Sequence, residues 1–319
     1  MYSRFWGKCA FPIHRGRANR AAIAAIAAVV FASAVAGTLE LAGASPTGGA
    51  VATAAMSEID TEDVFGFVEG ADIGRAGEQE VEIDGSLRSG KSTGTYNAAA
   101  TAFQYKYTAF ADFRISAVAT LADYEIDGVA GLSNLDRMSM QSLSFDARFR
   151  LLDRAKAPFG ATLSLQPHWG FADETSGVPL QHFGWVALLL ADRELVPDKL
   201  VGAINLSFDT DRTRLLPNHA VEQEPTPGIG AALAAQIAPD LWLGGEARYL
   251  RSYDGASLEV FSGQALYAGP TLYARIGKQS WVSAAFNIQI WGGAVGVPGG
   301  LDLLNFERYQ AKLRIGFEL

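Results

Sequence analysis

The chain has 319 residues, of which 49% are hydrophobic and 19% are charged, and its formal net charge is −8. This balance is typical of a folded chain and excludes an intrinsically disordered one. The acidic excess argues against nucleic acid as a partner, because a phosphate backbone attracts basic surfaces.

The first 36 residues have the pattern of a signal peptide. Five basic residues precede an apolar run, 21–36, whose only polar residue is Ser33. Small residues at Ala34 and Ala36 offer a cleavage site, and cleavage as late as residue 55 is compatible with the small residues that follow. A membrane anchor is the alternative, but the run is shorter than the ~20 residues that a spanning helix needs. Removal of residues 1–36 would also remove Cys9, the single cysteine, and leave no disulfide.

Residues 37–78 are expected to form a linker and a periplasmic N-terminal segment. The part up to Met56 is rich in small residues and low in complexity. Three glycines, Gly70, Gly74 and Gly77, do not have the spacing of a phosphate-binding loop. We expect them to mark a kinked entry into the first strand.

From residue 79 onward the sequence alternates with a period of two. Phe103, Tyr105 and Tyr107, for example, alternate with Gln104 and Lys106, as in a β-strand. About twelve such segments follow, each near the ~10 residues of a tilted membrane strand. They span residues 79–88, 103–109, 113–121, 142–150, 159–166, 183–191, 200–208, 229–237, 241–251, 266–276, 282–290 and 305–319.

The connections between these segments alternate in length. Short ones such as APD and GKQS are interleaved with longer ones such as EIDGVAGLSNLDRM. This asymmetry is typical of outer-membrane proteins with short periplasmic turns and longer extracellular loops. We therefore expect an all-β fold, a closed up-and-down antiparallel transmembrane β-barrel of about 12 strands over residues 79–319. The alternative is a soluble β-sandwich or lipocalin-like barrel, which turns its apolar face inward.

The last eleven residues, YQAKLRIGFEL, resemble the terminal strand of Gram-negative outer-membrane barrels. The pattern consists of Tyr309, Leu313, Ile315, Phe317 and Leu319, although Phe or Trp is usual at the last position. This resemblance implies recognition by the barrel-assembly machinery, location in the outer membrane, and contact with its lipid and lipopolysaccharide. We expect this strand to close the barrel onto residues 81–87, which leaves no free edge.

Three longer strings carry a second resemblance, over most of the chain after Asp63. FGFVEGADIGRAGEQEVE, RLLDRAKAPFG and APDLWLGGEARYLRSYDG are similar to an uncharacterised group of proteobacterial outer-membrane proteins. That resemblance implies location and fold, and it implies no activity.

The polar positions of the predicted strands carry charges of both signs. As lumen-lining candidates they are Glu80, Glu82, Lys106, Arg114, Asp146, Arg148, Arg150, His168, Glu246, Arg248, Arg308, Lys312 and Arg314. One interpretation is a passive, porin-like channel for small solutes with weak ion selectivity. The other is a barrel closed by charge pairs, which serves as a structural protein or meets external partners through loops 125–138 and 209–228.

Catalytic, cofactor-binding and metal-binding residues are not expected. A lipid-modifying enzyme would need Ser and His adjacent across strands, whereas Ser164 and His168 on one strand lie ~13 Å apart at the usual rise per residue. His182 and His219 are expected in solvated loops, without the spacing of a metal site. Pro167, which precedes His168, and Pro270 lie inside strand patterns, and we expect β-bulges there.

Overall fold

The computed structural model describes residues 60–214 and 221–319. The predicted signal peptide, residues 37–59 and His219 lie outside the described residues. Within the described residues there is no helix of the length and apolarity needed to cross a membrane.

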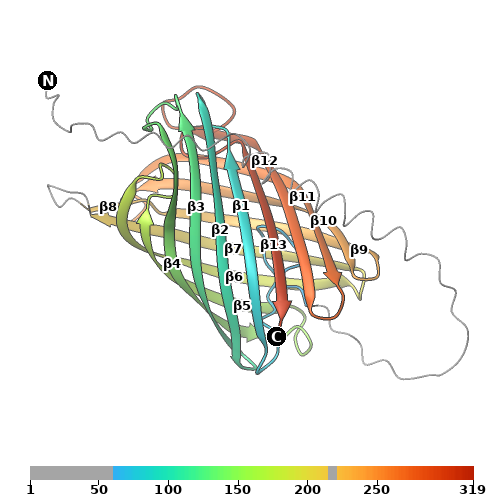
Figure 1. Ribbon diagram of the computed structural model, residues 1–319. Coiled ribbons are helices and arrows are strands. Elements are labelled where there is room, and N and C mark those ends of the chain that lie inside the picture. The colour runs from blue at the N-terminus through green and yellow to red at the C-terminus, as the bar shows by residue number, and fades with distance from the viewer. Residues whose placement is uncertain (1–59, 215–220) are drawn as a thin grey trace, which may run out of the picture. The chain divides into compact units, whose positions relative to one another are not determined.

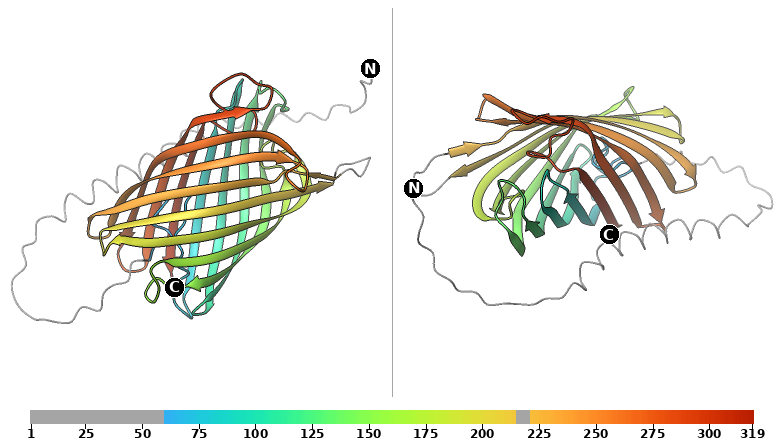
Figure 2. Two further views of the ribbon diagram at one scale, coloured as in Figure 1. Left: turned by 180° about the vertical axis from the view of Figure 1, so that it is seen from behind. Right: turned by 90° about the horizontal axis from the view of Figure 1, so that it is seen from above.

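Twelve long antiparallel strands form a closed barrel (Figure 1). They are β1 (Gln79–Ser89), β2 (Thr95–Phe110), β3 (Phe113–Asp127), β4 (Leu135–Leu152), β5 (Gly160–Ala172), β6 (Pro179–Val196), β7 (Leu200–Arg214), β9 (Thr226–Ala238), β10 (Leu241–Asp254), β11 (Val260–Ile276), β12 (Ser280–Ala294) and β13 (Tyr309–Glu318). The short β8 (Val221–Gln223) only extends the edge of β7. Neighbours along the chain pair with each other, and the strands run obliquely around the barrel (Figure 2). The predicted fold class is confirmed.

The seam between β1 and β13 closes the barrel. Their ladder runs from Glu80 opposite Glu318 to Ser89 opposite Tyr309, and it brings Ile83 opposite Ile315 on the same face. Both strands alternate apolar and polar residues in the same phase, so the seam keeps each face continuous. The predicted pairing of the last strand with residues 81–87 is confirmed.

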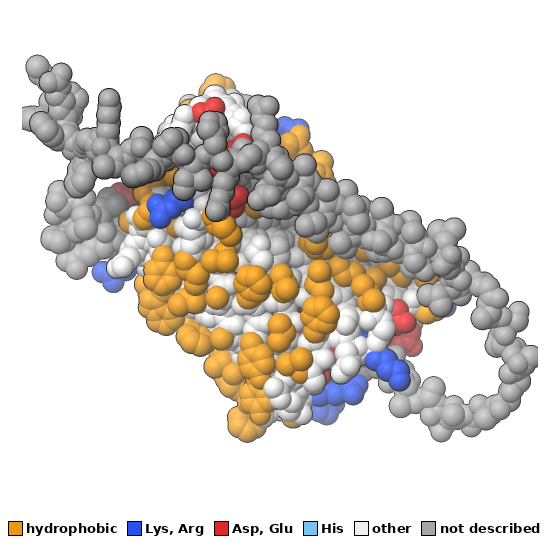
Figure 3. All heavy atoms as spheres, viewed as in Figure 1, with side chains coloured by type: hydrophobic (Ala, Val, Ile, Leu, Met, Phe, Trp, Pro, Cys, Tyr) orange, Lys and Arg blue, Asp and Glu red, His pale blue; other side chains and the backbone are white. Residues whose placement is uncertain are grey.

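The wall is apolar outside and polar inside. Val81, Ile83 and Phe103 are exposed on the outer face, whereas Glu80 and Lys106, which alternate with them, are buried. Hydrophobic side chains cover much of the outer surface in the view of Figure 3. A soluble sandwich or lipocalin-like barrel would have the opposite arrangement, so that alternative does not describe this chain.

The connections at the two ends of the barrel differ in length, as the sequence predicted. At one end, here called the turn end, β1 begins, β13 ends, and the connections are residues 111–112, 153–159, 197–199, 239–240 and 277–279. At the other end, here called the loop end, the connections include residues 90–94, 128–134, 173–178, 255–259 and 295–308.

Several strands extend further toward the loop end than predicted. β3 runs to Asp127 and β4 begins at Leu135, so half of the predicted loop 125–138 is strand. Likewise β7 runs to Arg214 and β9 begins at Thr226, so the predicted loop 209–228 is shorter. At the loop end the backbone ladder continues beyond the residues whose apolar alternation predicted these strands.

The predicted bulges at Pro167 and Pro270 are wrong. The ladder on one side of each proline is interrupted, but the register is the same before and after the interruption. A proline lacks the N–H that the ladder needs, and no extra residue is inserted to make a bulge. The register of β11 against β12 shifts instead between Leu266 and Tyr267.

Candidate functional site

The lumen is filled at the turn end by the chain's own residues 60–78, here called the plug segment. Val64, Phe65, Val68, Ala71 and Ile73 of this segment are at most 3% exposed. Residues 61–73 of the expected linker are therefore packed inside the barrel, whereas residues 75–77 are exposed. Gly74 and Gly77 have positive φ angles just before β1, as expected for a kinked entry, whereas Gly70 lies against Thr61 within the plug segment.

The apolar residues of the plug segment occupy space left by small wall residues. Val64, Phe65 and Val68 belong to one buried cluster with residues of β7, β9, β10, β11 and β12, namely Val201, Ala203, Ala232, Ala234, Trp242, Tyr273 and Trp281. A barrel of twelve strands is too wide for alanine side chains to fill. The plug segment supplies the missing volume.

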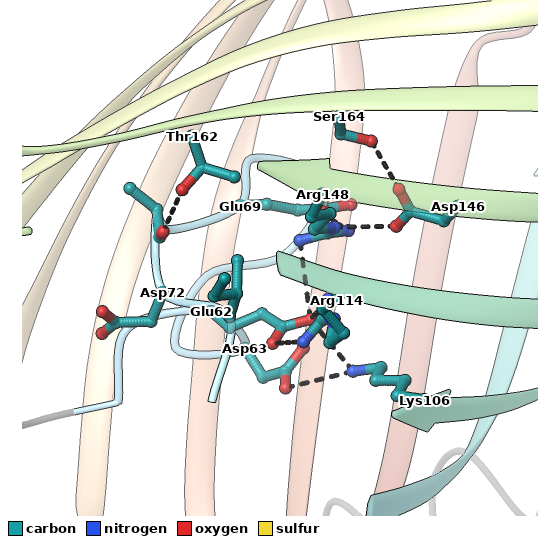
Figure 4. A network of polar contacts seen from close by, with 12 residues as sticks. Glu62, Asp63, Glu69, Asp72, Lys106, Arg114, Asp146, Arg148, Thr162 and Ser164 are labelled. Carbon is teal, nitrogen blue, oxygen red and sulfur yellow. Dashed lines mark hydrogen bonds and ion pairs between the residues drawn. The ribbon is translucent and has the colours of Figure 1, made fainter. Parts of the chain in front are cut away.

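A carboxylate of the plug segment binds three basic residues of the wall (Figure 4). Glu62 accepts bonds from Lys106 Nζ at 3.0 Å and from Arg114 Nη2 at 2.6 Å, and Arg148 Nη1 lies 3.5 Å from it. Burial alone would raise the pKa of Glu62, but the positive charges of Arg114, Lys106 and Arg148 hold that pKa well below its usual range. Glu62 is therefore a charged anchor in a site without access to bulk water.

Further ion pairs extend this anchor around the lumen. Arg148 Nη2 also donates to Glu69 of the plug segment at 2.6 Å, and its Nε donates to Asp146 at 2.7 Å. On β13, which only β1 separates from β2, Arg314 Nη1 donates to Asp63 at 2.7 Å. The plug segment thus supplies countercharges for strands β2, β3, β4 and β13.

Wall side chains also satisfy the irregular backbone of the plug segment. Glu246 accepts bonds from the N–H groups of Phe67 and Val68, both at 2.9 Å. Asn205 accepts from Glu69 N at 2.7 Å and donates to Glu69 O at 2.8 Å. A buried backbone without regular structure needs such partners, so these polar wall residues are matched to this particular segment.

A turn residue fastens the plug segment at the turn end. Arg154, in the β4–β5 connection, donates to Asp72 at 2.8 Å and to Thr61 Oγ1 at 2.9 Å. It also pairs with Asp192 of β6 at 2.9 Å, and Asp192 accepts a bond from Ala71 N at 2.7 Å. One guanidinium therefore joins a turn, a strand and the plug segment.

The lumen-lining candidates separate into three groups. Those that contact the plug segment through hydrogen bonds, ion pairs or ring contacts are Lys106, Arg114, Arg148, Arg150, Glu246, Arg248, Lys312 and Arg314. Glu80 and Glu82 act indirectly, because both pair with Lys106 Nζ, and Asp146 acts through Arg148. His168 contacts Asp211, and Arg308 lies over the Tyr309 ring. A pore-lining role for these residues stays a prediction.

Sequence reasoning missed the plug-side partners, Glu62, Asp63 and Glu69. They lie before the first strand in FGFVEG and its surroundings, where no period reveals a buried face. The residues of the predicted C-terminal signal lie on β13 and, for Leu319, directly after it. Tyr309, Phe317 and Leu319 are exposed, and the role of these residues in assembly stays a prediction.

The loop end contains a cavity of about 300 Å³ whose lining is strongly acidic. Seven carboxylates and one guanidinium line it: Asp173, Glu174, Asp209, Asp211, Glu222, Glu224, Glu307 and Arg88. Here called the acidic cavity, it also includes His182, which lies on β6 and is only 9% exposed. The expectation of a solvated loop position for His182 is wrong, because β6 extends far enough to carry its side chain into the lumen.

Ser164 and His168 have separate partners. Ser164 Oγ donates to Asp146 at 2.7 Å, whereas His168 Nε2 lies 2.7 Å from Asp211 Oδ1. The structure therefore does not join these two residues into a dyad.

An inward polar face, an outward apolar face and a filled lumen define the architecture of an outer-membrane type of β-barrel. The chain belongs to the family of unknown function DUF6662, which its residues 57–319 match. No curated protein matches the chain at a significant level.

Solved structures with a similar fold include three barrels. The COG4313 outer membrane channel from Pseudomonas putida F1 has a TM-score of 0.54 and 10% identity, over 79% of this chain and 100% of that chain. The NanC porin has a TM-score of 0.47 and 11% identity, over 75% and 100%. The translocator domain of the autotransporter NalP from Neisseria meningitidis has a TM-score of 0.45 and 13% identity, over 78% and 91%. At these identities the likeness concerns the fold alone.

Proposed function

We propose that this protein is a channel of the bacterial outer membrane for small hydrophilic solutes, and that its plug segment closes the lumen in the state described here. The apolar outer face and the likeness of the C-terminal strand to outer-membrane barrels support this location. The likeness of the fold to a solved outer membrane channel agrees with it.

The observation that carries the proposal is the separable character of the plug segment. From Glu62 to Asp72, its polar contacts with the wall are made through side chains, such as Glu62 with Arg114 and Glu246 with the N–H of Phe67. Buried charges are costly, and their pairing offsets that cost only in part. When such a segment leaves, water can solvate the polar groups of both surfaces, so these polar contacts are better suited to release than the apolar contacts of Val64, Phe65 and Val68.

Release of the plug segment would leave a polar lumen. Lys106, Arg114 and Arg314 would then face water together with acidic neighbours such as Glu82 and Glu246. Charges of both signs at this level favour weak selectivity between ions. The acidic cavity at the loop end would concentrate cations before they reach this level.

Planar-bilayer recording tests the proposal with the full chain and a variant that lacks residues 60–78. We expect rare, brief openings from the full chain and frequent, discrete conductance steps from the variant. Heat-dependent mobility in gels and the β-sheet circular dichroism spectrum verify that each protein is a folded barrel.

A folded deletion variant that leaves the bilayer sealed at every voltage would reject the channel. The barrel would then be a closed structural protein, the function that a filled lumen also favours. If the deletion variant does not fold, Glu62→Lys provides the same test, because it places a cation against Lys106, Arg114 and Arg148 without removing residues. A folded Glu62→Lys protein with a sealed lumen would equally reject the proposal.

A further inference from the structure

Two histidines and an aspartate meet inside the loop end of the barrel. His168 of β5, His182 of β6 and Asp211 of β7 come from three adjacent strands. His168 Nε2 lies 2.7 Å and His182 Nε2 3.5 Å from Asp211 Oδ1. One potential ligand atom from each residue lies within 4.8 Å of the other two, so a small adjustment would place all three around one metal ion.

Two glycines make this convergence possible. Gly184 lies between His168 and Asp211 in the ladder, and Gly170 lies opposite His182. A Cβ at Gly184 would lie 2.4 Å from His168 Nε2 and 2.2 Å from Asp211 Oδ1. A Cβ at Gly170 would lie 1.8 Å from the His182 ring. Glycine weakens a strand interior and often marks a close approach, and here the two glycines leave space for the imidazoles.

The hydrogen bonding of this cluster is incomplete. The His182 side chain is 5% exposed, and its Nδ1 is buried without a hydrogen-bond partner. Asp209, on the same face of β7 as Asp211, also has a buried carboxylate oxygen, Oδ1, without a partner. Buried polar atoms without partners are costly. A bound cation would offset this cost for the Asp209 carboxylate and would fix the orientation of the His182 ring.

The surroundings favour a cation. His182, Asp209 and Asp211 all line the acidic cavity with its seven carboxylates. The other carboxylate cluster in the described residues, Asp63 with Glu80 and Glu82, differs because its members already share the Lys106 ammonium. In the part of the chain that the structure describes, the ion pairs of the histidine cluster are those of His168 and His182 with Asp211, and no lysine or arginine joins them.

We propose that His168, His182 and Asp211 bind a divalent transition metal ion inside the loop end of the barrel. Two imidazoles and one carboxylate are a common ligand set for Zn²⁺ and leave a fourth position for water or a further ligand. Asp209 is the nearest candidate along β7 for that position. Metal binding would replace the hydrogen bond between His168 and Asp211, since ligands bind metal in their deprotonated forms. This site is independent of the channel proposal.

The test is a titration of the purified full chain with Zn²⁺ in competition with a chromogenic chelator, after removal of metal with EDTA. We expect saturation at one equivalent. Asp211→Asn and His182→Ala should weaken binding by at least the roughly 10–100-fold that is typical for loss of an outer-shell partner. Unsaturable binding to the wild-type protein, or unchanged affinity in both variants, would overturn the proposal.

Gly184→Ala tests the geometry without changing a ligand. Its new methyl group would separate His168 from Asp211, so we expect a similar loss of affinity. Gly245→Ala in β10 is the matched control, because a Cβ there lies 3.5 Å from its nearest neighbour, Gly269 O, and should leave binding unchanged. If a variant does not fold, the visible spectrum of the wild-type protein with Co²⁺ decides. Bands of a tetrahedral site with nitrogen ligands support the proposal, and the spectrum of hexaaqua Co²⁺ contradicts it.

Discussion

The substitution Glu62→Gln is the sharpest perturbation of the plug segment, because it removes one charge and almost no volume. Glu62 is 4% exposed and faces three cations. Lys106 would keep Glu80 and Glu82, and Arg148 would keep Glu69 and Asp146. The lost charge therefore affects mainly Arg114, whose side chain donates both of its hydrogen bonds within the described residues to the carboxylate of Glu62.

The size of the effect follows from the burial of this pair. Removing one partner of a buried ion pair costs about 3–5 kcal/mol, because the other charge is left without compensation. Glutamine keeps one carbonyl acceptor, so we expect the lower limit, about 3 kcal/mol. This cost applies to the state in which the plug segment is docked. It does not apply when the plug segment is released, because water then solvates Arg114. Docking should therefore weaken by about a hundredfold, at about 1.4 kcal/mol per factor of ten.

Single-channel recording measures this shift as open probability. We expect Glu62→Gln to raise it by about a hundredfold and the matched control Glu78→Gln to leave it near the wild-type value. Glu78 lies in the same segment, but among the described residues its carboxylate accepts a bond only from the N–H of Arg75 in its own turn. The double variant Glu62→Gln with Arg114→Gln should open less than Glu62→Gln alone, because no unpaired cation remains. Equal open probabilities for Glu62→Gln and Glu78→Gln would refute the assigned role of this charge.

Two further predictions concern pH and the outer face. In the docked plug segment the pKa of Glu62 is below its ordinary value of 4.5. The Glu62 charge therefore stabilises docking fully when the pH is above 4.5, and this stabilisation is lost only as the pH falls through the lower pKa of the docked state. The open probability of the full chain should therefore stay low from pH 7 to about pH 5 and rise only in stronger acid, and a rise between pH 7 and pH 5 would contradict this anchor. On the outer face, Leu206 is 48% exposed in the middle of β7 and pairs with Leu189 and Ile229. Leu206→Arg should lower the free energy of unfolding in lipid vesicles by about 2–4 kcal/mol, whereas Leu195→Arg, near the turn end of β6, should lower it by about 0–1 kcal/mol. Equal losses at the two positions would argue against a membrane around this face.

The strand framework was predictable because its signal is local. A period of two fixes which residues share a face. Strict alternation on residues 309–319, with a weaker alternation on residues 79–88, was enough to predict the seam. The loop-end extensions were missed because residues such as Asp136 and Met138 no longer alternate in polarity, although the backbone ladder continues there.

The contents of the lumen were not predictable in the same way. The plug segment has no regular backbone, so its buried residues carry no period, and Glu62 looked like any acidic residue of a linker. His168, His182 and Asp211 are far apart in sequence and meet only through the registers of β5, β6 and β7. The available signal for this cluster was a glycine two residues after each histidine, Gly170 after His168 and Gly184 after His182. Its meaning depends on a strand register that the sequence does not reveal.

A removable cross-link between the plug segment and the wall tests the central claim most directly. An ideal Cβ at Gly160 of β5 lies 3.2 Å from Ala71 Cβ, close to the about 3.5–4.5 Å of a disulfide. It also lies 2.6 Å from Asp192 Oδ1, so the Asp192 side chain has to turn aside. Ala71→Cys and Gly160→Cys are combined with Glu62→Gln, and with Cys9→Ser so that the introduced pair has no competing thiol. In one bilayer, we expect the oxidised protein to remain shut and to begin discrete openings when reductant is added. Equal conductance before and after reduction, with the disulfide verified by mass spectrometry, would show that residues 60–78 do not close this barrel.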